Sequence, residues 1–241
     1  MSAFSVNILR KAYKSGEGPR LALAGLSFEV QDGELVCVLG PSGAGKTTAL
    51  NIIAGLDSNF EGKVSFRDAK PHRLSYVFQD PRLLPWRTLI ENVSLPLKGK
   101  ADALDIAASW LERVGLSGCH HLYPGQASVG MQRRAAIARA FAFGPNVLLM
   151  DEPFVSLDEK AAGELRSLFI ALWKAERVTT LFVTHNVAEA AELATRVLVF
   201  SGSPARIAAD IDLCRESASG DNAELLLRSA LDAADARHSL S

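Results

Sequence analysis

The sequence predicts an α/β fold built on a mainly parallel sheet. Short apolar runs at residues 35–39 and 147–150 have the composition of buried strands of a parallel sheet. Helical patterns alternate with these runs, which is typical of a parallel sheet with helices on both sides. The N-terminal residues instead alternate between apolar and polar, and residues 80–143 show helical patterns without a convincing strand. We therefore expect an N-terminal antiparallel β part and an inserted helical subdomain.

The individual elements follow from local patterns along the chain. Alternation over residues 4–8 and 26–30 predicts two half-exposed antiparallel strands, with a turn at residues 15–19 between them. The remaining expected strands lie at residues 35–39, 64–66, 74–78, 147–150, 179–183 and 197–200. The expected helices lie at residues 49–54, 104–114, 131–143, 159–177, 187–193 and 223–236. Beyond Arg206 the chain becomes rich in Ala and Ser.

These elements predict one domain with elaborations, which suits a chain of 241 residues. We expect residues 1–79 and 144–210 to form the α/β core. Residues 80–143 would form the helical subdomain and residues 211–241 a helical C-terminal tail.

Composition excludes several classes of protein. Hydrophobic residues make up 48% of the chain, which argues against disorder, and a net charge of −1 argues against a nucleic-acid-binding surface. Three scattered cysteines give no disulfide framework or zinc spacing, so a reducing compartment fits. We find neither a signal peptide nor an apolar run of about 18 residues, so we expect a soluble chain that docks on membrane partners.

A phosphate-binding loop follows the apolar run at residues 35–39. The pattern of glycine, four residues, glycine, lysine and threonine stands between an expected strand and an expected helix. Backbone N–H groups of such a loop, together with the helix N-terminus, bind phosphates. Lys46 would reach the β- and γ-phosphates, and the Thr47 hydroxyl would hold Mg²⁺. The loop comprises Gly40, Pro41, Ser42, Gly43, Ala44, Gly45, Lys46, Thr47 and Thr48.

Two carboxylates follow the buried strand expected at residues 147–150. Ligands bind at the carboxyl ends of parallel strands, so Asp151 would hold Mg²⁺ there, directly or through water. Glu152 would orient and deprotonate the attacking water. An acidic surface pair without function is the alternative, and the phosphate loop argues against it.

With these motifs in place, the chain resembles the ATP-binding subunits of ATP-binding-cassette (ABC) transporters, from about Ser5 to about Ala208. Further segments match this family in order and spacing. They are Tyr13, Gln79 of the glutamine loop, the signature and its helix at residues 128–140, the segment Ser156-Leu157-Asp158, and His185. The resemblance implies a RecA-like P-loop NTPase fold and the hydrolysis of ATP with Mg²⁺.

The resemblance also implies roles for these residues. Gln79 would contact Mg²⁺ and the attacking water, His185 the γ-phosphate, and the Tyr13 ring the adenine. Two subunits, identical or different, would close head to tail over shared ATP. Ser128 and Gly130 of one subunit would then bind the γ-phosphate held by the other, and the loop of Asp158 would cross the interface. Without the family, Tyr13 could simply be a packed strand-end residue and Ser128 a helix cap.

One position departs from the family pattern. The first of the two glycines that usually follow the signature serine is Val129, and the preceding leucine is Ala127. A β-branched residue at this place would narrow the approach to the γ-phosphate or disfavour a positive φ. We therefore expect slower but real turnover, with tolerance of small residues as the milder interpretation.

The segment at residues 80–93 is expected to contact a membrane permease, as the family implies. Its sequence from Pro81 to Trp86 resembles that of importer subunits for nitrate, sulfonate and taurine. It also resembles that of relatives that transport thiamine precursors. A periplasmic solute-binding protein would then be an indirect partner, and the chain would lie on the cytoplasmic face of the inner membrane. Internal packing remains an alternative role for Trp86.

Other functions stay open at this point. A phosphate loop alone also allows a small-molecule kinase, although a kinase needs neither the signature helix nor the histidine. A non-transport ABC ATPase usually has two cassettes or a long coiled-coil insertion, and we find neither. A nucleotide-binding regulator with low turnover is kept open by Val129.

Overall fold

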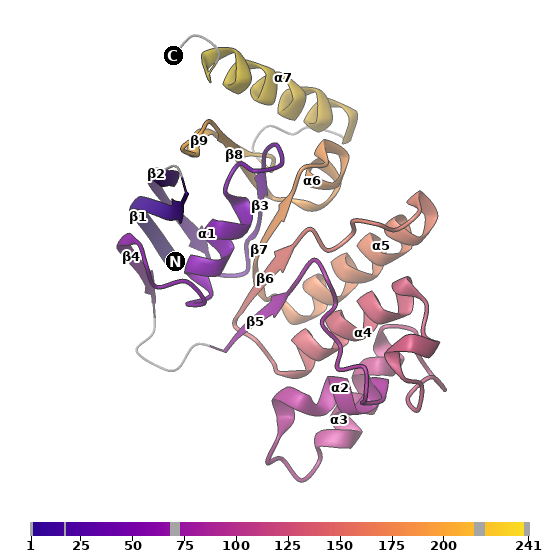
Figure 1. Cartoon of the computed structure of the whole chain (residues 1–241). Helices are drawn as coiled ribbons and strands as arrows, with labels where there is room; N and C mark the ends of the chain where they lie inside the picture. Colours follow the sequence, from indigo (N-terminus) through magenta and orange to yellow (C-terminus); the bar gives the residue numbers. More distant parts are fainter. Residues whose placement is uncertain (1, 17, 68–72, 215–219, 239–241) are drawn as a thin grey trace. The chain divides into compact units, whose positions relative to one another are not determined.

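The computed structural model describes residues 2–16, 18–67, 73–214 and 220–238 (Figure 1). These residues form two compact units. The first unit combines residues 1–71 with residues 179–241, and the second unit spans residues 72–178. The two units are described in turn, with the labels of Figure 1.

The first unit contains the expected antiparallel sheet. Its strands are β1 (Ser2–Ser15), β2 (Gly18–Gln31) and β4 (Glu61–Phe66), and β1 lies between the other two. Apolar side chains alternate along β1 and β2 and are buried on one face, as the sequence pattern predicts. Both strands run further than predicted, to a connection at residues 16 and 17, of which Glu17 lies outside the described residues.

Three further strands of the first unit pair in parallel. Strand β3 (Leu35–Leu39) pairs in parallel with β7 (Thr179–Thr184) and with β8 (Arg196–Ser201). All five residues of β3 are buried. This burial explains its continuous apolar run, because a central strand covered on both faces has no solvent-facing positions.

An additional strand, β9 (Arg206–Asp212), pairs antiparallel with β8. This strand is not among the elements that the sequence predicts. Most side chains of β9 are only half-buried, and two of its residues are aspartates. An edge strand of that composition lacks the apolar period that marks a strand in a sequence.

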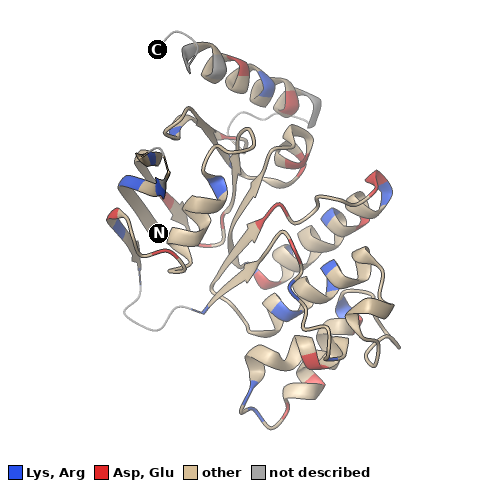
Figure 2. Cartoon of the chain, viewed as in Figure 1, with Lys and Arg blue, Asp and Glu red and all other residues tan. Residues whose placement is uncertain are grey.

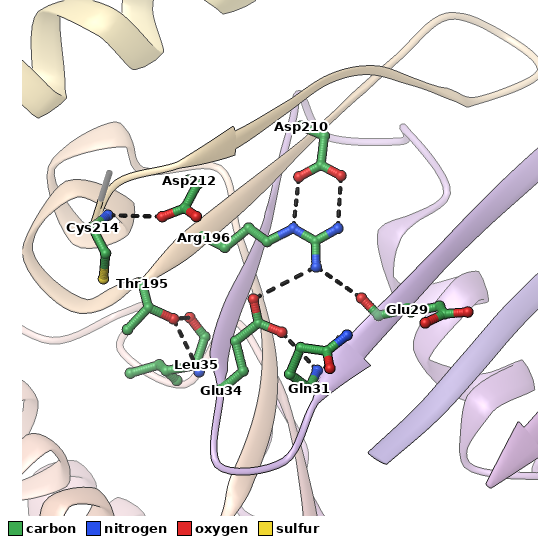
Figure 3. A network of polar contacts seen from close by, with 9 residues as sticks. All are labelled: Glu29, Gln31, Glu34, Leu35, Thr195, Arg196, Asp210, Asp212 and Cys214. Carbon is green, nitrogen blue, oxygen red and sulfur yellow. Dashed lines mark hydrogen bonds and ion pairs between the residues drawn. The ribbon is translucent and has the colours of Figure 1, made fainter. Parts of the chain in front are cut away.

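A charged cluster joins β9 to the elements beside it (Figure 3). Arg196 donates from Nε and Nη2 to the two carboxylate oxygens of Asp210, each at 2.7 Å. Its Nη1 donates to the Glu29 carbonyl oxygen at 2.8 Å and lies 3.5 Å from Glu34. The bidentate contact with Asp210, with a smaller contribution from Glu34, raises the pKa of Arg196 above its usual range, although burial opposes this effect. One guanidinium therefore connects β8 with β9, with β2 and with the β2–β3 connection.

Three helices complete the first unit. They are α1 (Lys46–Ile53), α6 (Val187–Leu193) and α7 (Gly220–His238). Helix α7 packs against α6 and β8 and is the expected C-terminal helix, with Leu227 fully buried (Figure 1). Residues 215–219 and 239–241 of the predicted tail lie outside the described residues.

The second unit holds a parallel strand pair and most of the helices. Strand β5 (Leu74–Val77) pairs in parallel with β6 (Val147–Asp151), all of which is buried. The helical elements are α2 (Leu89–Ser94), the 3₁₀ turn Leu95–Leu97, α3 (Ala103–Arg113), the 3₁₀ turn Pro124–Gln126, α4 (Val129–Ala142) and α5 (Glu159–Glu176). Helices α2, α3 and α4 pack against one another.

Residues 80–143, all of which are described, contain helices and no strand. Strands β5 and β6 and helix α5 belong to the same compact unit as these helices. The division into core, helical subdomain and tail stays a prediction. Across the described residues, no helix is both long and apolar enough to cross a bilayer. Basic and acidic residues are interspersed along both units, in keeping with the net charge of −1 (Figure 2).

Candidate functional site

The phosphate loop follows β3 directly and leads into α1. A Cβ on Gly40 would lie 2.5 Å from the carbonyl oxygen of Phe200, so only glycine fits there. Gly45 begins α1 with a φ of 71°, and a Cβ on it would lie 2.5 Å from Leu23. Gly43 also has a positive φ, of 81°. The glycines therefore permit a tight curl that side chains would prevent.

Lys46 lies inside this curl. Its Nζ donates to the carbonyl oxygens of Gly40 at 2.8 Å and Pro41 at 2.9 Å, and the side chain is buried. The ammonium group is thus held at the centre of the loop, where the backbone N–H groups of the helix N-terminus also favour negative charge. Thr47, which follows, is exposed.

Tyr13 lies beside the end of the loop. Its hydroxyl donates to the Thr48 hydroxyl at 3.2 Å and contacts Asp57 at 3.4 Å. Lys11 packs over the face of the Tyr13 ring. Its Nζ lies 4.6 Å from the centroid of that ring and 2.6 Å from the Asp57 carboxylate. Tyr13 remains 43% exposed, so its ring is both fixed at the hydroxyl and open to a stacking partner.

The contact with Lys11 favours the charged form of Asp57. Burial by itself raises the pKa of Asp57, but the hydrogen bonds from Lys11, the Asn59 backbone and Tyr13, with the charge of Lys11, lower it overall. Lys11 is almost fully buried and also donates to the Asn59 carbonyl oxygen at 2.8 Å. This ion pair supports Tyr13 from beneath, and no sequence pattern predicts it.

His185 follows β7 at the same sheet edge as the phosphate loop. Thr184 pairs with Leu39 in the register of β7 and β3, so His185 and Gly40 both leave the sheet one residue later. His185 is exposed, whereas the neighbouring Thr184 is buried and accepts a 3.0 Å hydrogen bond from the Asn186 N–H. The parallel register therefore brings the histidine and the phosphate loop to one edge.

In the second unit, Asp151 ends β6. It is 5% exposed and accepts a hydrogen bond from the Tyr76 hydroxyl at 3.3 Å. Burial, followed by the charge of Asp151, raises the pKa of Tyr76 well above its usual range. The next residue, Glu152, has a φ of 43°, a left-handed conformation that is rare for residues other than glycine. Such strain is typical of functional sites.

Gln79 follows β5, the strand that pairs with β6. It is exposed, and the residues around it form an aromatic stack. The rings of Tyr76 and Phe78 lie 4.1 Å apart, and the guanidinium of Arg82 covers Phe78 at 3.7 Å. Arg139 of α4 donates to the carbonyl oxygens of Arg82 at 2.9 Å and Pro81 at 2.6 Å. The glutamine loop is thus fixed just beyond Gln79.

The signature serine begins α4. Ser128 caps the helix, and its hydroxyl accepts a 3.2 Å hydrogen bond from the Met131 N–H. Val129 is the first helical residue, so its backbone is helical and the expected conflict with a positive φ does not arise here. Its side chain is 52% exposed. Of the two effects expected for valine, only the narrowing of the approach to the γ-phosphate by its bulk is left. Gly130 is half-buried behind it.

Asp158 caps α5 in the same way, because its carboxylate accepts a 2.9 Å hydrogen bond from the Ala161 N–H. The structure therefore groups the candidate residues by unit. The first unit holds Tyr13, the phosphate loop and His185, and the second unit holds Gln79, Ser128, Gly130, Asp151, Glu152 and Asp158.

Comparison with known families identifies this arrangement. The family model described as "ABC transporter" matches residues 23–155, from β2 to the segment that follows Glu152. The chain belongs to the ABC transporter family. The predicted family is thereby confirmed, and so is the predicted enzyme class, an ABC-type ATPase.

Curated relatives agree with this assignment. An aliphatic sulfonates import ATP-binding protein from Bacillus cereus is 39% identical over 208 residues, which cover 84% of this chain and 83% of that protein. A bicarbonate transport ATP-binding protein from Synechocystis is 37% identical over 211 residues, which cover 83% of this chain and 74% of that protein. This ABC ATPase thus matches most of the length of both proteins.

A solved structure confirms the predicted α/β fold of the ABC ATPase. It is the dimeric post-hydrolysis state of the ATP-binding cassette MJ0796 bound to ADP and Pi. That chain superposes with a TM-score of 0.77 and 31% identity, over 87% of this chain and 98% of its own length. The roles of the individual site residues stay proposals.

Proposed function

We propose that this ABC ATPase is the energy-coupling subunit of a membrane importer for a small solute. Its solute would be of the nitrate, sulfonate or taurine kind, or a thiamine precursor. The placement of the phosphate loop and His185 at one sheet edge carries the ATPase part of this proposal. The printed functions of the relatives, import of aliphatic sulfonates and transport of bicarbonate, support the importer part.

ATP would bind along the phosphate loop. Lys46 would contact the β- and γ-phosphates, the loop N–H groups would surround them, and Tyr13 would stack on the adenine. The candidate Mg²⁺ ligands are the hydroxyl of Thr47, the carboxylate of Asp151 and the amide oxygen of Gln79. These are hard oxygen donors of the kind that Mg²⁺ prefers, and a buried carboxylate at a strand end suits a cation. Bound Mg²⁺ would neutralise charge on the phosphates.

Hydrolysis would depend on positioning and electrostatics. Glu152 would orient the attacking water and accept its proton, and His185 with Lys46 would stabilise negative charge on the transferred phosphoryl group. The strained backbone of Glu152 supports this role, because an unfavourable φ persists where its surroundings fix it.

A second copy of the chain would complete each nucleotide site. The capped N-terminus of α4, with Ser128 and Gly130, would bind the γ-phosphate held by the partner, and the loop before Asp158 would cross the interface. ATP would then favour the closed dimer because it binds that state better. The dimeric form of the similar cassette supports this arrangement.

Residues 80–93 would contact the permease on the cytoplasmic face of the inner membrane, and a periplasmic binding protein would deliver the solute. Trp86 is 71% exposed, which argues against internal packing as its role. Asn92 is fully buried and donates to the carbonyl oxygens of Leu84, Arg87 and Thr88 at 3.0–3.1 Å. An exposed aromatic side chain on a loop whose backbone is fixed in this way suits a partner groove or helix.

A low-turnover nucleotide-binding regulator is a second candidate, and the exposed side chain of Val129 at the signature helix favours it. ATP hydrolysis by the full chain, reconstituted with its permease in vesicles, separates the two functions. An importer subunit should hydrolyse ATP faster with permease and solute-loaded binding protein. Glu152→Gln should bind ATP, retain the closed dimer and lose at least about a hundredfold in rate. Unchanged hydrolysis in that variant would refute the role of Glu152, and no hydrolysis by the parent would refute the importer.

A further inference from the structure

An arginine on α4 lies against the loop that follows Glu152. Arg133 is 6% exposed, and its Nη1 donates a 2.8 Å hydrogen bond to the carbonyl oxygen of Pro153. Pro153 is buried as well, and the next residue, Phe154, packs in the core against Phe169, with the ring centroids 6.3 Å apart. The peptide after Glu152 is therefore held on both sides by buried groups.

Burial of this guanidinium is costly for stability. Its Nε is buried and has no hydrogen-bond partner among the residues that the structure describes. Burial lowers the pKa of Arg133, and the negative charge of Asp80 in the glutamine loop opposes that effect. A buried donor without a partner destabilises a fold, so this residue is poorly explained by stability alone.

The backbone beside Arg133 needs such a restraint. Glu152 has a φ of 43°, and a residue in that region relaxes unless its neighbours fix it. The hydrogen bond to the Pro153 carbonyl is a direct restraint on the adjoining peptide unit. A shift of that peptide would move the carboxylate of Glu152 with it. Even a small misplacement of a catalytic group lowers the rate of reaction strongly.

We propose that Arg133 is a positioning residue for hydrolysis, which holds the Pro153 carbonyl and thereby fixes the carboxylate of Glu152 in place. This inference rests on the proposed role of Glu152. Arg133 lies about one helical turn beyond Val129 on α4, so the helix that begins at the signature would also support the loop of Glu152. The hydrogen bond to Pro153 links Arg133 to the residue that directly follows Glu152.

The neighbouring arginine provides a matched control. Arg134 lies on the same helix and donates to the Val114 carbonyl oxygen at 3.2 Å and to Glu164 at 3.2 Å. It therefore makes the same kind of contact, a guanidinium to a backbone carbonyl, but away from the loop of Glu152. Loss of a buried or half-buried arginine from α4 is common to both substitutions, whereas loss of the restraint on Pro153 is specific to Arg133.

The test compares Arg133→Met, Arg133→Lys and Arg134→Met in the full chain with its permease. ATP affinity is measured with a fluorescent nucleotide, kcat by phosphate release, and folding by thermal denaturation. We expect Arg133→Met to bind nucleotide normally and to lose about tenfold to a hundredfold in kcat, the scale of loss from a misplaced catalytic group. Arg133→Lys keeps a donor and should recover most of the rate, and Arg134→Met should stay within about twofold of the parent.

Three results would overturn the inference while the proposed function stands. The first is a kcat of Arg133→Met within about twofold of the parent. The second is an equal loss of kcat in Arg134→Met, and the third is a folded Arg133→Lys variant whose kcat does not recover. If Arg133→Met does not fold, Arg133→Gln takes its place, because its shorter amide keeps a polar group at this position but reaches less far toward Pro153. The same loss of kcat is then expected, and the same results would overturn the inference. Failure of the parent to hydrolyse ATP would instead remove the proposed function itself.

Discussion

The hydroxyl of Thr184 donates a 2.6 Å hydrogen bond to the carboxylate of Glu189, and both side chains are buried. The same hydroxyl accepts from the Asn186 N–H, and the Asn186 side chain caps α6 by accepting from the Ala188 N–H at 2.9 Å. The exposed His185 is therefore carried by a short loop whose two flanking residues are both fixed to α6.

Removal of the Thr184 hydroxyl should loosen this loop. Thr184→Val keeps the shape but deprives Glu189 of a donor and the Asn186 N–H of its acceptor, so we expect the free energy of unfolding to fall by about 2 kcal/mol. Thr184→Ser keeps the hydroxyl and serves as the control. Urea unfolding measures the stability, and phosphate release should show slower hydrolysis in Thr184→Val. Equal stability of the two variants would contradict the prediction.

The ion pair between Lys11 and Asp57 predicts a dependence of stability on pH. The pKa of Asp57 is lowered in the folded protein, so its contribution is complete above the ordinary Asp pKa of about 4. The contribution is lost as the pH falls through the folded pKa. Asp57→Asn leaves the buried Lys11 without its counter-charge and should cost about 3 kcal/mol near pH 7.

Urea unfolding of the parent and Asp57→Asn between pH 3 and pH 7 checks this prediction. The difference between the two proteins should be constant above about pH 5 and should shrink below about pH 4. A difference that does not change over this range would show that the pair does not control the acid sensitivity.

The side chain of Val129 should slow hydrolysis by its bulk. It is exposed at the first position of α4, where it can obstruct the approach of a phosphate to the helix N-terminus. Val129→Gly should therefore raise the ATPase rate, and Val129→Ala should give an intermediate rate. Phosphate release measures both. No gain in Val129→Gly would mean that valine is tolerated at this position.

Trp86 should contribute to binding of the permease. Truncation of a tryptophan at the centre of an interface typically costs about 2 kcal/mol, so Trp86→Ala, which removes an exposed ring, should weaken binding roughly thirtyfold. Leu104→Ala removes another exposed apolar side chain of the second unit and is the control. Co-purification and titration with the detergent-solubilised permease provide the measurement. Equal binding by both variants would argue against residues 80–93 as the contact.

Much of the fold could be predicted because its signals are local. The buried runs of β3 and β6 are continuously apolar, and the phosphate loop has fixed spacing between its glycines and Lys46. Strand β9 could not be predicted because its pairing depends on β8 and on the contact between Asp210 and Arg196. A partner in another segment gives no periodic signal in the strand itself.

The same distinction holds for the candidate site. The motif residues could be found from spacing, but their supports could not, since each is a contact between separate segments. Lys11 with Asp57, Asn92 with the loop of Trp86, and Arg133 with Pro153 are examples. Asn92 directly follows the charged Glu91, so its neighbours in the sequence do not mark it as a buried hydrogen-bonding residue.

The guanidinium of Arg196 sets a limit on how far the chain can be shortened from its C-terminus. A fragment that stops at Ser201 would retain every motif residue, yet it would leave Arg196 without the Asp210 carboxylate and expose the open edge of β8. Trimmed forms intended for crystallisation or labelling should therefore keep residues 206–212, although no nucleotide-binding motif lies among them.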